Sequence, residues 1–364
     1  MPYWLANAAC RGRRAREFRR FLDDAAEPFA QRFKHERGNL AVGVVEPLPS
    51  YFVPMKVYVG ITDSDWYRTL AAQPAIREVN FWKPGGEASF RALQPGEPFL
   101  FKTHWSHNRI VGGGYFQGFT RLPISAAWDF FGFGNGVESL EEMRIRVGKY
   151  RKETIRKGDD PHIGCVLLND VVFFSESESV PPPDDFSKNI VQGKTYVAQQ
   201  PGALPIIDLV VQRLAVQLSR SESSIARIDG PVFGDPRLVI PRLGQGGFKA
   251  LVHDAYRDRC SITGHKIRPT LQAAHILPVN KGGEHRLDNG LLVRSDVHTM
   301  FDRGYLGVDP EFKLRVSPRV RAEFGNGDEF YEREGSVIAL PEHARDRPNS
   351  EFLTWHMDEV FLSA

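Results

Sequence analysis

The sequence predicts an α+β protein with at least two folded domains, and three observations support this. Short β-branched and aromatic runs separated by Gly and Pro turns occupy residues 56–175, which is typical of a small barrel-like sheet with helices. Apolar residues recur with helical spacing at 137–157, 206–221 and 244–259. The chain has 364 residues, and a domain commonly contains about 150, so two or three domains are expected.

The order of these patterns divides the chain into four parts. Residues 1–54 begin rich in arginine and end in the breaker-rich PLPSYFVP, so we expect an extension that is disordered or that follows from a misassigned start codon. We expect the first folded domain at 55–205 and a linker with one helix at 206–243. The second folded domain then covers 244–364 and opens with the helical pattern GQGGFKALVHDAYRDR.

The composition excludes several classes of protein. Hydrophobic residues make up 41% and charged residues 25%, the balance of a soluble globular protein. No apolar run reaches the roughly 20 residues that cross a membrane, so no membrane partner is expected. Cys10, Cys165 and Cys260 form no CxxC pair, which argues against a structural zinc site and favours a reducing, cytoplasmic location. The net charge of +2 is compatible with a nucleic-acid partner without requiring one.

The clearest chemical pattern is LQAAHILPVNKGGEHRLDNGLLVRSDVHTMFDRG, residues 271–304. It predicts an apolar strand that carries His275, a glycine-rich loop, a second short strand, and a helix that ends at Gly304. His298 and Asp302 are four residues apart and therefore share one face of that helix. An imidazole and a carboxylate so placed can bind one divalent cation.

These residue types suit hydrolysis of a phosphodiester bond. A histidine on the facing strand can remove a proton from water at neutral pH, because its ordinary pKa is about 6.5. A divalent cation offsets the charge that develops on the phosphate and on the leaving oxygen. His275 alone would more often be a core histidine, and Asn289 before Gly290 would by itself be a turn. Their occurrence together in a strand, loop, strand and helix favours a nuclease.

This stretch resembles the ββα-metal motif of the HNH nuclease family in order and spacing. The elements that carry the resemblance are CSITG, AAHILP, DNGLLV and DVHTMFDRGYLGVD, and the likeness covers roughly residues 240–362. It implies that His275 is the general base and that Asn289 holds the loop that orients it. It also implies Mg²⁺, Mn²⁺ or another divalent cation as cofactor, with His298 as a metal ligand and Asp302 as a second one.

Two positions depart from the family pattern. Many relatives carry an acidic metal ligand immediately before the base histidine, where this chain has Ala274. Asp302, Gln272 or a substrate phosphate would then have to complete the ligand set. Relatives with a zinc knuckle use paired cysteines, whereas Cys260 stands alone and His265 follows too closely for a closed tetrahedral site. The first departure leaves a nucleic-acid-binding protein with a degenerate, inactive core open as an alternative.

Basic and aromatic side chains indicate how the substrate would be held. Lys281, Arg286 and Arg294 are candidates for contacts with the DNA backbone, with solvated surface charge as the alternative. We expect His285, in the glycine-rich loop, at the surface, with a phosphate contact as the alternative. We expect His253 to be structural.

An HNH module has little sequence specificity, so the first domain should select the substrate. A flipped base is typically held between aromatic rings and read at its edge by hydrogen bonds. Our candidates for base binding are Phe81, Trp82, Trp105 and Tyr115. The alternative for each is an ordinary core role, because aromatic residues in strands usually pack inside.

MKVYVGITDSDWYRTL, VNFWKP, LQPGEPFLFK and RIVGGGYF resemble the PUA-like group, which includes EVE, ASCH and YTH-type domains, over roughly residues 56–175. The resemblance implies a PUA-like small β-barrel with helices that binds modified bases in an aromatic cage. With an HNH module, the layout is similar to modification-dependent restriction enzymes, which cut DNA carrying modified cytosine. DNA is therefore the implied partner, and a homodimer would allow both strands to be cut. An RNA-directed nuclease stays open, because PUA-like domains also bind RNA.

Overall fold

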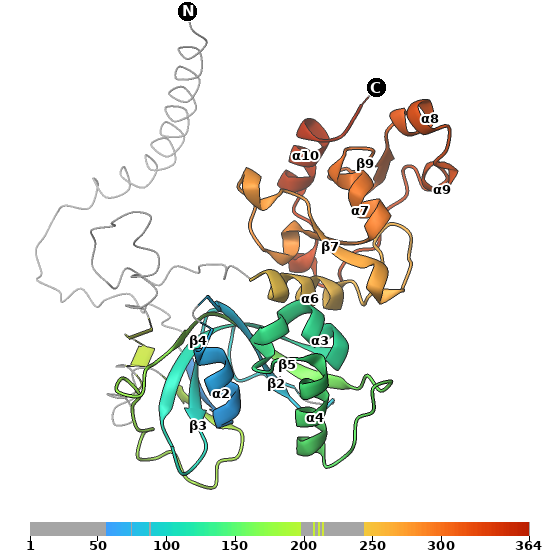
Figure 1. The fold of residues 1–364 in the computed structure, drawn as a ribbon. Helices are drawn as coiled ribbons and strands as arrows, with labels where there is room; N and C mark the ends of the chain where they lie inside the picture. The colour runs from blue at the N-terminus through green and yellow to red at the C-terminus, as the bar shows by residue number, and fades with distance from the viewer. Residues whose placement is uncertain are drawn as a thin grey trace, which may run out of the picture. The chain divides into compact units, whose positions relative to one another are not determined.

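The computed structural model describes residues 56–73, 75–86, 89–197 and 244–363, together with 207, 210, 211, 213 and 214 (Figure 1). The predicted extension at 1–54 and most of the predicted linker at 206–243 lie outside these residues. The five described linker positions are helical. No helix in the described ranges is both long and apolar enough to cross a bilayer.

A six-stranded mixed sheet forms the centre of the first domain. Its strands are β1 (Lys56–Thr62), β2 (Glu78–Lys83), β3 (Pro98–Thr103), β4 (Ile110–Pro123), β5 (His162–Phe173) and β6 (Gly193–Val197). Their order is β2-β5-β4-β3-β1-β6. Strands β1 and β3 pair in parallel, and the other pairs are antiparallel. Valine and phenylalanine recur in these strands because their side chains suit a pleated, half-buried surface.

The α+β prediction is confirmed, but the sheet is not a closed barrel. Among the described residues, β2 pairs only with β5 and β6 only with β1, so the two edges do not meet. Closure would require these edges to share hydrogen bonds. A short 3₁₀ helix, η1 (Gly132–Asn135), packs against β2 instead. Asn135 accepts hydrogen bonds from the side chains of Asn80 and Trp82, both at 2.9 Å.

Three helices pack on the sheet, and α2 has a well-defined start. Helix α2 covers Ser64–Ala71, α3 covers Ile124–Phe131 and α4 covers Leu140–Arg151. The carboxylate of Asp63 accepts from the backbone N–H groups of Asp65 and Trp66, as expected for an N-cap. Helix α4 is shorter than the helix predicted at 137–157. It ends where Lys152 adopts a left-handed conformation with φ 59°.

Side chains on the two faces of the sheet form separate hydrophobic clusters. Phe99 and Phe101 of β3 pack on one face with Trp66 of α2. Leu100, which lies between them in sequence, packs on the other face with Val210. This alternation follows from the two-residue period of a strand.

The second domain contains the predicted order of strand, loop, strand and helix. Its elements are α6 (Gln245–Ala255), β7 (Leu271–His275), β8 (Gly290–Arg294), α7 (Ser295–Asp302), β9 (Leu306–Val308), β10 (Leu314–Val316), α8 (Arg319–Phe324), α9 (Asp328–Tyr331) and α10 (Ser350–Glu359). Strands β7 and β8 pair antiparallel, with His275 opposite Gly290. Helix α7 follows β8 directly, so its first turn starts beside the hairpin.

Hydrogen bonds close the knuckle before β7, where some relatives use zinc. The sulfur of Cys260 is buried and accepts from the backbone N–H groups of Thr263 and Arg294, both at 3.4 Å. The backbone N–H of Cys260 donates to the carbonyl of His265 at 2.9 Å. The turn is therefore held by hydrogen bonds of Cys260, through its sulfur and its backbone.

Helix α6 begins against a carboxylate of the first domain. Glu78, at the start of β2, accepts hydrogen bonds from the backbone N–H groups of Gly246 and Gly247. An added Cβ at Gly244 would overlap this carboxylate, so a larger residue there would have to displace the Glu78 side chain. A carboxylate is favourable at this end of a helix because the helix dipole is positive there.

Candidate functional site

His275 lies at the end of β7 with its ring stacked on Phe248 of α6. The ring centroids are 4.2 Å apart and the planes differ by 12°. Its Nε2 lies 3.0 Å from Nδ1 of His285. Burial, together with the neighbouring imidazoles of His285 and His298, lowers the pKa of His275 to about 4. The ring is therefore neutral at pH 7, which is the form that can accept a proton.

Asn289 holds the loop that follows His275. Its side chain is fully buried at 0% exposure. Its Oδ1 accepts from the backbone N–H of Leu277 at 2.8 Å, and its Nδ2 donates to the carbonyls of Leu277 and Glu284, both at 2.9 Å. These bonds join the two ends of the loop, in keeping with the role that the family resemblance implies.

His298 and Asp302 lie together on α7, as their spacing predicts. His298 Nδ1 lies 2.7 Å from Oε1 of Gln272, and His298 Nε2 lies 3.4 Å from Oδ2 of Asp302. An amide oxygen can only accept, so Nδ1 of His298 donates to Gln272. In the neutral imidazole, Nε2 then carries the lone pair and is the nitrogen nearer to Asp302. Burial raises the pKa of Asp302, and the nearby imidazole opposes this change.

His298 and Asp302 are the two candidate protein ligands for a divalent cation. No three His, Cys, Asp or Glu side chains in the described part of the chain are grouped to hold a metal. Mg²⁺ commonly keeps several waters and takes further oxygens from substrate phosphate. The His298 and Asp302 pair fits such a cation. Ala274, at the position where relatives carry an acid, is completely buried.

One cavity of about 770 Å³ brings the predicted catalytic residues together. Its lining includes His275, His285, His298, Asp302 and Lys281. Asn289 does not line this cavity. Its side chain bonds to Leu277, in the loop that follows His275. Two candidate metal ligands and a neutral imidazole line this cavity, and these are the kinds of group that metal-dependent hydrolysis of a phosphodiester uses.

The three basic candidates differ in their surroundings. Arg294 forms ion pairs with Asp296 at 2.6 Å and with Glu329 at 3.3 Å. Arg286 is paired with Asp288, its near neighbour in sequence. Lys281 is exposed and lines the cavity. Both arginines would have to exchange these partners to bind phosphate, whereas Lys281 already lies beside the site.

We expect Gln272→Ala to weaken the apparent metal affinity in cleavage by about 10- to 100-fold, because the partner that orients a metal-binding imidazole is lost. The Mn²⁺ concentration that gives half-maximal cleavage measures this change. Gln272→Glu keeps an oxygen acceptor and should stay close to wild type. Equal metal dependence in the wild-type and alanine proteins would refute this role for Gln272.

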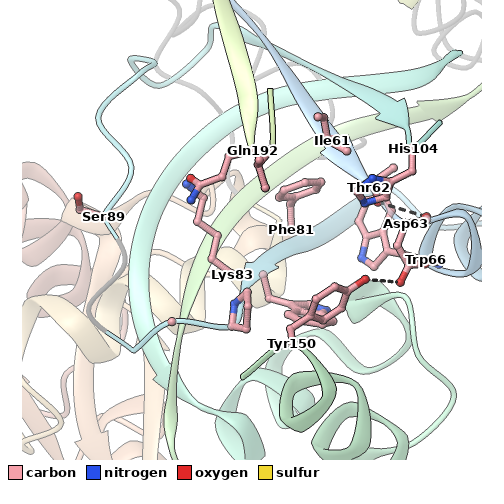
Figure 2. Close-up of a pocket in the computed structure, with 14 residues that line it drawn as sticks. Ile61, Thr62, Asp63, Trp66, Phe81, Lys83, Ser89, His104, Tyr150 and Gln192 are labelled. Atoms are coloured by element: carbon pink, nitrogen blue, oxygen red, sulfur yellow. Dashed lines mark hydrogen bonds between the residues drawn. The ribbon is translucent and has the colours of Figure 1, made fainter. Parts of the chain in front are cut away.

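A second cavity, of about 640 Å³, lies in the first domain (Figure 2). Phe81 and Trp82 of β2, Trp66 of α2 and Tyr150 of α4 supply its aromatic lining. Figure 2 shows the Tyr150 hydroxyl directed at Asp63, where it donates to Oδ2 at 2.8 Å.

In addition to burial, the hydrogen bond between Tyr150 and Asp63 shifts the pKa values of the two groups in opposite directions. Burial and the bond to the carboxylate raise the pKa of Tyr150 to about 12, so its hydroxyl stays neutral. Burial also acts to raise the pKa of Asp63, but the bonds from the Trp66 N–H and from Tyr150 outweigh it, and the pKa falls below its ordinary value. The cavity thus combines flat apolar rings with a carboxylate acceptor.

The structure places two of the four predicted base-binding residues on this cavity and two outside its lining. Phe81 and Trp82 line the cavity, and the indole N–H of Trp82 is bonded to the Asn135 carbonyl. Trp105 and Tyr115 are not among the lining residues. Trp105 is 65% exposed, and Lys188 Nζ lies 3.8 Å from its ring centroid.

Comparison with known proteins gives one family match. Residues 260–309 match a family model described as HNH endonuclease, which supports nuclease activity. Among solved structures, the chain is similar to one titled modification dependent TagI restriction endonuclease, with 13% identity, a TM-score of 0.25, and coverage of 79% of this chain and 77% of that one. It is also similar to the ASCH protein of Zymomonas mobilis, with 8% identity, a TM-score of 0.22, and coverage of 31% and 67%. No curated protein matches the chain.

Proposed function

We propose that this protein is a metal-dependent DNA endonuclease that selects modified DNA through its first domain, as a modification-dependent restriction enzyme does. The observation that carries the proposal is that His275, His298 and Asp302 line one cavity, and that all three lie in the segment that matches the HNH endonuclease model. We place its action in the cytoplasm, supported by the buried free thiols of Cys165 and Cys260.

Each catalytic side chain has a separate task in this proposal. Neutral His275 takes a proton from the attacking water. Asn289 fixes the loop, so that the imidazole keeps its orientation. His298 and Asp302 would hold the divalent cation, which supplies positive charge to the phosphate and the leaving oxygen when bound.

The cavity of the first domain supports selection of a base. A flat heteroaromatic ring can stack on Phe81 or Trp82, and the Asp63 carboxylate can accept from an exocyclic amine. Cytosine carries such an amine, and its 5-position carries the methyl or hydroxymethyl group of the modified forms. Modified cytosine is therefore the candidate that we test first.

Plasmids that contain cytosine, 5-methylcytosine or 5-hydroxymethylcytosine test the proposal when incubated with EDTA, Mg²⁺ or Mn²⁺. We expect cleavage only with a divalent cation and faster cleavage of a modified plasmid. Plasmid that stays intact in every metal would favour the degenerate core that Ala274 suggests. Preferential cleavage of matched RNA would favour the RNA-directed alternative. Sedimentation of the enzyme on uncut modified DNA tests the homodimer.

We expect Trp82→Ala to reduce the preference for modified over unmodified plasmid, because it removes a ring from the cavity and with it stacking of about 1–3 kcal/mol. Trp105→Ala is the matched control, since Trp105 is exposed and does not line the cavity. Cleavage of both plasmids and the melting temperature are measured for each variant. If Trp82→Ala folds and keeps the full preference, Trp82 does not bind the base.

A further inference from the structure

We propose that His285 is a positioning residue for the general base, because its Nδ1 accepts the Nε2 proton of His275 and so leaves Nδ1 of His275 free to take a proton from water. This inference rests on the proposed nuclease function and extends it to a residue with no assigned role. The two nitrogens are 3.0 Å apart, and the ring planes differ by 55°.

Only one proton can lie in a hydrogen bond between two neutral imidazoles. If His275 donates from Nε2, its Nδ1 keeps a lone pair and can act as a base. If His285 donates from Nδ1 instead, the lone pair of His275 Nε2 is used in the bond and its Nδ1 carries the proton, so His275 has no basic nitrogen left. Catalysis by His275 therefore requires His285 to be the acceptor.

Several independent contacts hold the loop so that His285 lies next to His275. Asn289 binds the carbonyl of Glu284, the residue before His285. An added Cβ at Gly283 would collide with the carbonyl of Leu277, so the return of the loop depends on glycine. Phe248 stacks on His275 and lies 5.7 Å from the His285 ring, so one aromatic side chain supports both imidazoles.

The bond also continues to act after the proton transfer. When Nδ1 of His275 has taken the proton of the attacking water, the ring is a cation that still donates from Nε2 to neutral His285. A hydrogen bond from a charged donor is stronger than one between neutral groups. While His285 stays neutral, it therefore accepts from Nε2 both before and after this step. A protonated His285 would instead repel the His275 cation, so burial lowers the pKa of His275 and this repulsion lowers it further.

Two substitutions separate this role from simple packing. His285→Ala removes the acceptor, and we expect the single-turnover cleavage rate with saturating DNA and Mn²⁺ to fall by about 10- to 100-fold. His285→Asn places an amide oxygen near the position of Nδ1 and should recover most of the rate. His343→Ala, an exposed histidine of the same module, is the control and should match wild type. DNA affinity and the Mn²⁺ midpoint should stay unchanged in all variants.

A second measurement does not depend on cleavage. Nitrogen-15 NMR of histidine-labelled protein should show His275 protonated at Nε2 in the wild type and in His285→Asn, and a mixture of tautomers in His285→Ala. An unchanged rate in His285→Ala, a loss in DNA affinity instead of rate, or protonation of wild-type His275 at Nδ1 would each overturn the inference. A wild-type enzyme that cuts no DNA in any metal would overturn the nuclease proposal, while the NMR result would still judge the hydrogen bond.

Discussion

Replacement of His275 by alanine is expected to slow DNA cleavage by about 10²- to 10⁴-fold, the usual contribution of a general base. The reason is that the variant has no neutral imidazole beside the metal-binding pair, although His298 and Asp302 remain. DNA binding should stay unchanged, because His275 is half-buried and stacked on Phe248. Rates from single-turnover cleavage of modified plasmid and affinity from fluorescence anisotropy measure the two quantities separately.

His343→Ala again provides a histidine control from the same module. His275→Asn offers a closer comparison, since it keeps a polar group of similar reach but cannot take up a proton. We expect it to be as slow as the alanine variant. Cleavage at the wild-type rate by His275→Ala in any divalent metal would show that another group activates the water, and the assignment of the base would have to be abandoned.

Asn289→Ala is expected to affect both folding and catalysis. The substitution leaves the N–H of Leu277 and the carbonyls of Leu277 and Glu284 without their partner in a buried place. An unsatisfied buried group costs about 1–3 kcal/mol, so the free energy of unfolding should fall by at least that amount. Because the loop also carries His285, the cleavage rate should fall by about 10- to 100-fold even where the protein is folded.

Urea denaturation and single-turnover cleavage at low temperature test these two effects. Asn289→Asp keeps the acceptor for Leu277 but places a carboxylate against two carbonyl oxygens, so it should not restore the wild-type properties. Asn326→Ala, an exposed asparagine of the same module, is the control. A stable Asn289→Ala protein with an unchanged rate would mean that the loop keeps its shape without these bonds.

Local sequence patterns predicted the parts of the site that lie close together in the chain. The spacing of His298 and Asp302 placed both on one helical face, and the apolar run before His275 predicted its strand. The sheet of the first domain was also expected from its β-branched runs. Its closure was not predictable, because closure depends on what covers β2, and η1 occupies that position through Asn135.

The contacts that sequence reasoning missed connect distant residues or depend on the course of a loop. Tyr150 lines the cavity of the first domain because α4 packs close to Asp63, 87 positions away in sequence. His285 was expected at the surface, yet it is half-buried and bonded to His275. Arg294 was a candidate for DNA, and the second of its acidic partners, Glu329, is 35 positions away. Spacing within a short motif carries no information about such pairs.

The contact between Glu78 and α6 bears on any attempt to transplant the nuclease. A fragment that starts at Gln245 would lose the acceptor of two helical N–H groups and leave the first turn of α6 unsatisfied. The same helix carries Phe248, the ring on which His275 rests. A chimaera with a foreign recognition domain would therefore need a new carboxylate at that helix start before its cutting rate could be compared with that of the parent.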